Sequence, residues 1–257
     1  MRALDNDKPV VLTIAGLDPS GGAGIVADIK TIAAFGCFPA AAITSITFQN
    51  AQRVFGAEHQ LAATLRAQVE PIVADARVAA AKTGMLPTAE IVKEVVRLFR
   101  ENDLPAPVVD PVMVSTSGHD LIGEAAFHIL KNELLPLARL VTPNIPEAER
   151  LAGFPINSEA DMRRAAEGIK LLGAPAVLVK GGHRSELQVE ALDILIDNAG
   201  CFTDFREKYI DVGELHGTGC TLSAAIAASL AKGLTLAGAV GAAKKYLTDQ
   251  IRSLIRS

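Results

Sequence analysis

Short apolar segments alternate with longer helical segments along most of the chain, and this alternation constrains the fold more than any other feature. Residues 10–16, VVLTIAG, are rich in β-branched side chains and end in glycine, which is typical of a buried strand. Residues 24–35 then place apolar side chains at helical spacing before Gly36. Strands that alternate with helices pair in parallel, with helices on both faces. We therefore expect one three-layer α/β/α domain over residues 1–257, with a mostly parallel central sheet.

The same alternation continues to the end of the chain. We expect further strands at 39–47, 78–85, 108–111, 139–144 and 176–182, and further helices at 61–74, 88–101 and 159–172. Residues 191–197 and 200–206, joined by Asn198 and Ala199, indicate a small antiparallel hairpin. No proline- or serine-rich linker divides the chain, so the pattern favours a single domain.

Residues 222–243 test whether the chain enters a membrane. Their only charge is Lys232, and the segment is long enough for a membrane-spanning helix. It consists mainly of Ala, Gly, Ser and Thr, however, and Lys232 followed by Gly233 is typical of a helix end. We expect two buried helices, at 222–233 and 236–255, and the membrane span is the weaker alternative.

Charge and cysteine content exclude several classes of protein. The 25 Lys and Arg residues against 29 acids give a net charge of −4, which argues against a general nucleic-acid binder. Cys37, Cys201 and Cys220 lack metal-type spacing, so neither a zinc site nor a disulfide framework is expected, and we assign structural roles to the first two. The first residues lack the apolar run of a secretory signal, which favours a cytoplasmic protein.

A polar or glycine-rich cluster follows six of the expected strands. In chain order the clusters are AGLDPSGGAG, TFQN, KTGM, DPVM, TPNIPEAE and KGGH. Ligands of open α/β sheets bind beyond the carboxyl ends of the strands. Six clusters in the same register therefore predict one shared site.

The segment HGTGC, residues 216–220, precedes the first of the two buried helices. Glycines at a helix start let backbone N–H groups converge, and the helix dipole favours negative charge there. The segment therefore indicates an anion hole for a phosphoryl group, or alternatively an ordinary turn with Thr218 or Thr221 as the cap. Cys220 at the helix start is expected to have a lowered thiol pKa, and the alternative is a small buried apolar side chain. We assign no role to His216, because a lone histidine is more often a satisfied polar group than a base.

Asn144 and Glu147 lie three residues apart, which places them on one face of a helix. They are suited to bind the waters of a magnesium ion, and the alternative is a capping box. Asp110, which ends a strand, can hold a water on the same ion, and the alternative is an ordinary loop acid before Pro111. Lys180 ends an apolar strand and is either a phosphate clamp or a surface lysine, and Lys82 poses the same question.

Residues 18–28, DPSGGAGIVAD, open another helix but match neither GxGxxG nor the Walker P-loop. The glycines would let the backbone approach a small ligand closely. Asp28 lies one turn into this helix, where a solvated acid is the simplest interpretation.

Taken together, these segments resemble one family, the hydroxymethylpyrimidine/phosphomethylpyrimidine kinases of thiamine biosynthesis, which are members of the ribokinase superfamily. The likeness covers nearly the whole chain, through LTIAGLDPSGGAGIVADIKT, TFQN, KTGML, DPVM, SGHDLI, LLPLARLVTPNIPEAE, VLVKGGH and HGTGCTLSAAIAASLAKG. Several clusters in this order and spacing are far more specific than a single motif.

The resemblance implies a ribokinase-like fold, ATP with Mg²⁺, a small-molecule substrate and a homodimer. It implies two successive phosphorylations, first of 4-amino-5-hydroxymethyl-2-methylpyrimidine and then of its monophosphate. By matching positions it places five residues around the pyrimidine: Gly16, Ala23, Asp28, Gln49 and Met85. It assigns the metal, partly through water, and the nucleotide phosphates to Asp110, Asn144, Glu147 and Lys180. It assigns the anion hole to Gly217, Thr218, Gly219 and Cys220. Thr218 would also bind nucleotide, and Lys180 would share in the transfer step. Cys220 would take the place of the aspartate base of sugar-kinase relatives.

The sequence departs from the family pattern at a few positions. Val26 stands where many relatives have glutamine, Phe48 stands where a small residue is usual, and the Gly/Pro/His-bearing tail common in relatives does not follow Ile255. We expect Phe48 to point away from Gln49, to the opposite face of the strand. Two alternatives stay open: a pyridoxal or pyridoxine kinase on the same scaffold, and a non-catalytic pyrimidine sensor. Gln49 with Asn50 favours the aminopyrimidine.

Overall fold

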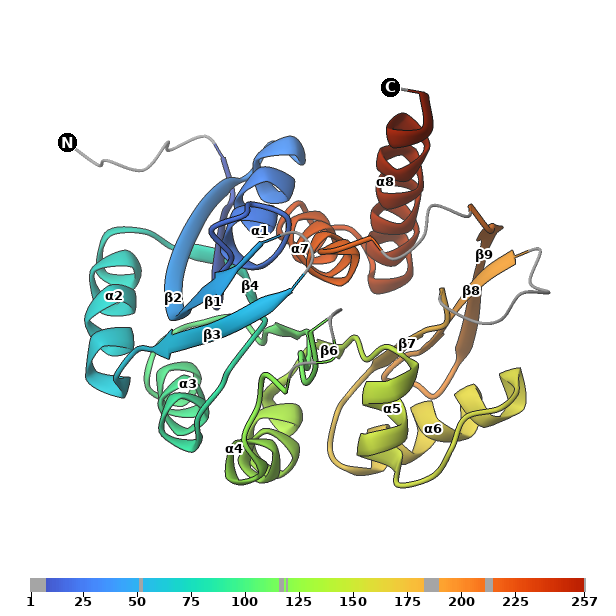
Figure 1. Ribbon diagram of the computed structural model, residues 1–257, viewed down its shortest axis with the longest axis horizontal. Helices are drawn as coiled ribbons and strands as arrows, with labels where there is room; N and C mark the ends of the chain where they lie inside the picture. Colours follow the sequence, from blue (N-terminus) through green and yellow to red (C-terminus); the bar gives the residue numbers. More distant parts are fainter. Residues whose placement is uncertain are drawn as a thin grey trace.

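The computed structural model describes residues 8–50, 53–115, 118, 120–182, 190–210 and 215–256. The described residues form one sheet of nine strands in the order β3-β2-β1-β4-β5-β6-β7-β8-β9 (Figure 1). The strands are β1 Val10–Leu17, β2 Phe38–Gln49, β3 Val54–His59, β4 Val78–Thr83, β5 Val108–Val109, β6 Leu140–Val141, β7 Val177–Lys180, β8 Glu190–Ile196 and β9 Phe202–Lys208. The α-helices are α1 Gly24–Ala34, α2 Ala62–Asp75, α3 Ala89–Glu101, α4 Glu124–Ile129, α5 Ile145–Ala152, α6 Glu159–Leu171, α7 Thr218–Ala231 and α8 Leu236–Arg256.

The sheet is mostly parallel. Strands β2, β1, β4, β5, β6 and β7 pair in parallel, whereas β3 at one edge and β8 and β9 at the other are antiparallel. The predicted fold class and the predicted hairpin are therefore confirmed. The hairpin turn is longer than predicted, because the Asp197 N–H donates to the carbonyl of Cys201 at 3.0 Å and Gly200 adopts a φ of +82° inside the turn.

Two hydrophobic cores cover the two faces of the sheet. Leu12 and Ile14 of β1 belong to a core that also contains side chains of α2 to α6, whereas Val11 belongs to a core with side chains of α1, α7 and α8. Figure 1 shows these two groups of helices on opposite sides of the strands. A parallel strand that is covered on both faces is apolar at nearly every position. This explains why β1 could be recognised from its uninterrupted apolar sequence.

Residues 222–243 form two helices, α7 and α8, as expected, but only α7 is buried, since α8 is exposed along one face. Every side chain of α7 from Leu222 to Leu230 is buried. Its small side chains let it pack closely between α1 and α8 (Figure 1). Within the described part of the chain, no helix is both long enough and apolar enough to cross a bilayer.

Strand β3 and helix α4 are present in the structure but were not predicted from the sequence. Strand β3 is a half-exposed edge strand without a regular alternation of apolar and polar residues, and α4 is only six residues long. Strand β2 also runs two residues further than predicted, to Gln49. This extension matters for function, because it carries Gln49 to the carboxyl edge of the parallel strands.

Candidate active site

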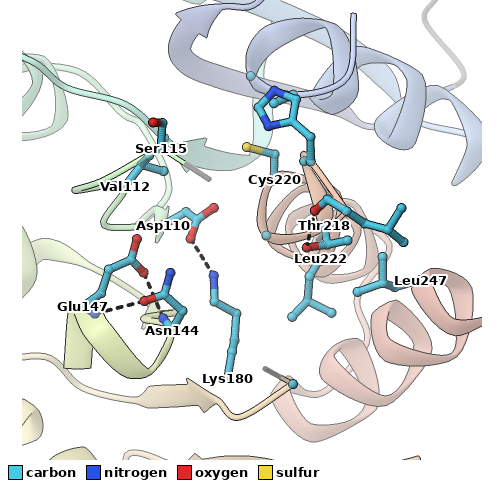
Figure 2. A pocket seen from close by; sticks show the side chains of 18 of the residues that line it. Asp110, Val112, Ser115, Asn144, Glu147, Lys180, Thr218, Cys220, Leu222 and Leu247 are labelled. Atoms are coloured by element: carbon cyan, nitrogen blue, oxygen red, sulfur yellow. Dashed lines mark hydrogen bonds and ion pairs between the residues drawn. The ribbon is translucent and has the colours of Figure 1, made fainter. Parts of the chain in front are cut away.

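A cavity of about 690 Å³ opens at the carboxyl ends of the parallel strands. Its lining includes residues from all six clusters that follow strands: Gly16 and Asp18, Gln49, Met85, Asp110, Asn144, and Lys180. The start of α7 also lines it, through Gly217, Thr218, Gly219 and Cys220. The structure therefore brings the six clusters and the predicted anion hole into one space, with α7 facing the charged residues (Figure 2).

The first turn of α7 is built for close contact with the loop between β1 and α1. Gly217 is the residue before the helix and has a φ of +84°. A Cβ atom at Gly217 would lie 1.9 Å from the carbonyl oxygen of Gly22, so no side chain fits there. No side chain caps the start of α7 in the described structure, which argues against the alternative of a threonine cap. The leading N–H groups of α7 and its dipole therefore favour an anion in the adjoining cavity.

Asp18 holds the β1–α1 loop in shape. Its carboxylate accepts hydrogen bonds from the N–H and Oγ of Ser20 at 2.8 and 2.7 Å, and from the N–H groups of Gly22 and Ala23 at 3.1 and 2.9 Å. Burial raises the pKa of Asp18, but these bonds and one from His216 hold it below its usual value. Asp18 was not singled out from the sequence, although Asp followed by Pro-Ser is a common turn signal.

Asp110 and Lys180 form an ion pair at the centre of the cavity wall. Lys180 Nζ lies 3.0 Å from Asp110 Oδ1, as Figure 2 shows. Thr142 and Ser223 also donate hydrogen bonds to the Asp110 carboxylate, at 3.2 and 3.1 Å. Burial opposes ionisation of Asp110, yet the charges of Lys180 and Lys82, with the hydrogen bonds from Lys180 and Ser223, lower its pKa. Lys180 is therefore turned into the site by a buried carboxylate and is no ordinary surface lysine.

Asn144 and Glu147 form a complete capping box at the start of α5. The Glu147 N–H donates to Asn144 Oδ1 at 2.9 Å, and the Asn144 N–H donates to Glu147 Oε2 at 2.8 Å. Burial, together with repulsion from Asp110, raises the pKa of Glu147 to about 7, although Lys180 opposes the shift. The pair therefore does cap α5, as the alternative interpretation held. Glu147 also lines the cavity.

Four of the five residues predicted around the pyrimidine also line the cavity: Gly16, Ala23, Gln49 and Met85. A Cβ atom at Gly16 would lie only 3.0 Å from the Met85 sulfur, so glycine keeps this wall open. Phe48 is about half exposed and does not line the cavity, as expected for a side chain on the face opposite Gln49. Val26 also lies outside the lining.

A model of the family described as phosphomethylpyrimidine kinase matches residues 18–256. The chain belongs to this family. The hydroxymethylpyrimidine/phosphomethylpyrimidine kinase of Streptomyces coelicolor is 43% identical over 243 residues, which cover 95% of this chain and 88% of that protein. The family predicted from the sequence motifs is therefore confirmed.

Solved structures of kinases share the fold. A crystal structure of phosphomethylpyrimidine kinase from Clostridium difficile is 40% identical, covers 95% of this chain and all of that one, and superposes with a TM-score of 0.83. An ADP complex of Bacillus subtilis pyridoxal kinase is 37% identical, with 94% and 91% covered and a TM-score of 0.86. The ribokinase-like fold is thus confirmed, but two kinases with differently named substrates share it.

Two expectations for this phosphomethylpyrimidine kinase family member do not fit the structure. Asp28 does not line the cavity, because it is fully buried and bonded to Lys82 and Thr13. Cys220 lines the cavity, but burial raises the pKa of its thiol to about 11 against the opposing charge of Lys82. The expected lowering of the Cys220 pKa is therefore wrong, since desolvation of the thiol outweighs the charge of Lys82.

Sequence reasoning also missed a second buried ion pair at the cavity. Lys244 Nζ lies 2.7 Å from Asp193 Oδ2 and donates to the carbonyls of Ala191 and Phe205 at 3.0 and 2.9 Å. These contacts join α8 to the β8–β9 hairpin on the side of the cavity lined by Leu247 and Thr248. The sequence signal for this ion pair was the two adjacent lysines, Lys244 and Lys245, in a helix of small residues. When such a helix packs on a sheet, one of the two lysines has to face the sheet and needs an acidic partner.

Proposed function

We propose that the protein is an ATP-dependent kinase of thiamine biosynthesis that phosphorylates 4-amino-5-hydroxymethyl-2-methylpyrimidine and then its monophosphate. Its family makes it a phosphotransferase, as the sequence predicted. The observation that carries the choice of substrate is that one cavity is lined by two kinds of groups. Gly16, Gln49 and Met85 suit a small flat ring, and Lys180 with the start of α7 suits phosphates.

Lys180 and the amides of α7 are the groups of this chain that stabilise charge during transfer. In a loose phosphoryl-transfer transition state, positioning and charge neutralisation contribute more than removal of a proton from the nucleophile. A Cβ atom at Gly219 would lie 3.2 Å from Lys180 Nζ, which places the lysine against the first turn of α7. A phosphoryl group between them would receive an ammonium charge from one side and N–H dipoles from the other.

The two phosphorylations place different demands on the residues at the acceptor. The first acceptor is a hydroxyl, whose proton the Cys220 sulfur can take only after the thiol has ionised. The second acceptor is a phosphate oxygen that is already largely ionised at neutral pH, because its second pKa is about 6. One site therefore serves both steps, and only the first depends on a base.

The residues present also fit a magnesium ion held mainly through water. No cluster of three or more His, Cys, Asp or Glu side chains suited to a metal exists in the described structure. Mg²⁺ typically keeps several waters and uses only one or two carboxylates together with substrate phosphates. Asp110 and Glu147 supply two buried carboxylates that repel each other, a repulsion that a cation would relieve. Asn144 completes this donor set, and the ion would neutralise phosphate charge.

A single incubation tests the proposed function. The protein, ATP and Mg²⁺ are mixed with either hydroxymethylpyrimidine or pyridoxal, and the products are identified by mass. We expect the pyrimidine monophosphate first and the diphosphate later, with less product from pyridoxal. Phosphorylation of pyridoxal alone would make the rival kinase the correct assignment. Tight binding of the pyrimidine without ADP release would identify a sensor.

We also propose that the protein forms a homodimer through β2 and β3. Three large apolar side chains on these strands are exposed, Ile46, Phe48 and Phe55. Apolar patches of this kind often mark contacts between proteins. Light scattering should give twice the chain mass for the wild type and a smaller mass for Phe48→Glu with Phe55→Glu. A monomeric wild type at micromolar concentration contradicts the proposal.

A further inference from the structure

His216 contacts two other side chains through the same ring nitrogen. Its Nε2 lies 3.1 Å from Asp18 Oδ2 and 3.1 Å from Gln49 Nε2. All three residues line the cavity. An imidazole nitrogen carries either one hydrogen or one lone pair in the plane of the ring, so it cannot donate to one neighbour and accept from the other. Only one arrangement of hydrogens satisfies both contacts.

Asp18 decides which arrangement this is. An ionised carboxylate only accepts hydrogen bonds, and the bonds from Ser20, Gly22 and Ala23 keep Asp18 from turning away. The hydrogen of His216 is therefore on Nε2, where it points to Asp18. The amide nitrogen of Gln49 is also a donor, and two donors at 3.1 Å do not bond. A half-turn of the amide exchanges its nitrogen with its oxygen, so that the one Nε2–H is shared between two acceptors, Asp18 Oδ2 and Gln49 Oε1.

We propose that His216 is a positioning residue for substrate recognition, which fixes the Gln49 amide with its oxygen toward Nε2–H and its NH₂ group toward the cavity. This inference rests on the proposed function. In that orientation the NH₂ group donates to a ring nitrogen of the aminopyrimidine. The second lone pair of Oε1 stays available for the neighbouring amino group of the substrate.

The fixed order of donor and acceptor also selects against pyridoxal. The aminopyrimidine carries an amino group, a donor, next to its hydroxymethyl group, and a ring nitrogen follows. Pyridoxal carries an aldehyde, an acceptor, at the first of these positions and a hydroxyl-bearing carbon at the second. A site that presents unmatched polar groups to a ligand rejects it strongly. Without His216 the Gln49 amide can turn to suit either ring, so the preference should fall.

Steady-state kinetics with hydroxymethylpyrimidine test the inference. We expect His216→Leu to raise the KM for the pyrimidine about tenfold, the effect of one buried hydrogen bond. The kcat should stay within about twofold of the wild type and the KM for ATP should not change, because the phosphate side of the cavity is untouched. His216→Gln should recover most of the loss, since its amide N–H can replace Nε2–H. His128→Leu, at an exposed position of α4, is the matched control and should leave every constant unchanged.

A double-mutant cycle separates positioning from a structural role. If His216 acts through Gln49, then His216→Leu combined with Gln49→Leu should bind the pyrimidine no more weakly than Gln49→Leu alone. Calorimetric Kd values supply the cycle without turnover. Additive losses, an equal fall in kcat, or failure of His216→Gln to recover the KM would overturn the inference while leaving the kinase assignment intact. A wild type that phosphorylates pyridoxal but not the pyrimidine would overturn both.

Discussion

Lys82 Nζ donates hydrogen bonds to both carboxylate oxygens of Asp28, at 2.8 and 3.0 Å, and neither side chain is exposed. Thr13 Oγ1 donates a further bond to Asp28 at 2.6 Å. Burial lowers the pKa of Lys82, but the charge of Asp28 more than reverses this effect, so the ammonium group stays charged. The three residues tie β1, β4 and α1 together behind the cavity wall.

Breaking this pair should destabilise the fold without a direct effect on substrate binding. We expect Asp28→Asn to lower the free energy of unfolding by about 3 to 5 kcal/mol, because it leaves the buried charge of Lys82 unpaired. Urea denaturation followed by circular dichroism measures this loss. Asp28→Leu combined with Lys82→Met is the control and should be less harmful than Asp28→Asn, since neither charge is then buried alone. Equal unfolding free energies for Asp28→Asn and the wild type would show that the pair contributes nothing.

Local patterns sufficed to predict most of the fold. β1 and β7 are covered on both faces, so each is a nearly continuous apolar run that sequence alone reveals. The clusters after the parallel strands were predicted to meet, because parallel strands in a right-handed α/β sheet end at the same edge. Strand β3 and helix α4 escaped prediction because neither carries a long periodic pattern.

The unpredicted parts of the site depend on contacts between distant residues. From the sequence alone, Asp28 is most simply a solvated acid in the first turn of a helix. In the structure β4 places Lys82, which is 54 residues away in the sequence, beside it. Lys244 and Asp193 are 51 residues apart and meet only when α8 packs on the hairpin. The pKa of Cys220 likewise depends on how deeply the assembled cavity buries it, which the position at a helix start does not tell.

The first phosphorylation should depend on pH in a way that the second does not. Because the pKa of Cys220 is raised to about 11, the thiol is protonated at neutral pH and the thiolate fraction grows about tenfold per unit toward that pKa. Single-turnover rates of the first step should therefore rise between about pH 7 and 9. The second step, whose acceptor is already ionised, should stay flat.

Cys220→Ala tests the same division between the two steps. It should slow the first phosphorylation more than the second and remove the dependence of the first on pH. Cys201→Ala, at an exposed cysteine next to the hairpin, is the matched control and should behave as the wild type. Comparable losses in both single-turnover rates would refute the role of Cys220 as a base for the first step.

Lys180 should contribute to the rate of transfer rather than to binding of the pyrimidine. We expect Lys180→Met to lower kcat by about 10² to 10³, the usual cost of losing one group that stabilises transition-state charge. The KM for hydroxymethylpyrimidine should change little, because Lys180 adjoins Asp110 and the first turn of α7, where we place the phosphates. ADP release at saturating substrate measures kcat, and Lys180→Arg, which keeps the charge, should lose less. A kcat close to that of the wild type in Lys180→Met would exclude this role.

Glu147 has two roles in this structure that one substitution can separate. Glutamine also closes a capping box, so Glu147→Gln should keep the hydrogen bond to the Asn144 N–H and leave the free energy of unfolding nearly unchanged. The substitution removes a buried carboxylate next to Asp110, however, and should raise the Mg²⁺ concentration needed for half-maximal activity by about 10- to 100-fold.

Asn144→Ala provides the comparison, since it removes the side chain that caps the Glu147 N–H. It should cost about 1 kcal/mol of unfolding free energy, whatever its effect on the metal. Titration of activity with Mg²⁺, together with urea denaturation of both variants, gives the four values needed. If Glu147→Gln destabilises the protein as much as Asn144→Ala and leaves the Mg²⁺ requirement unchanged, then Glu147 serves only the helix, and the carboxylate that faces the ion is Asp110 alone.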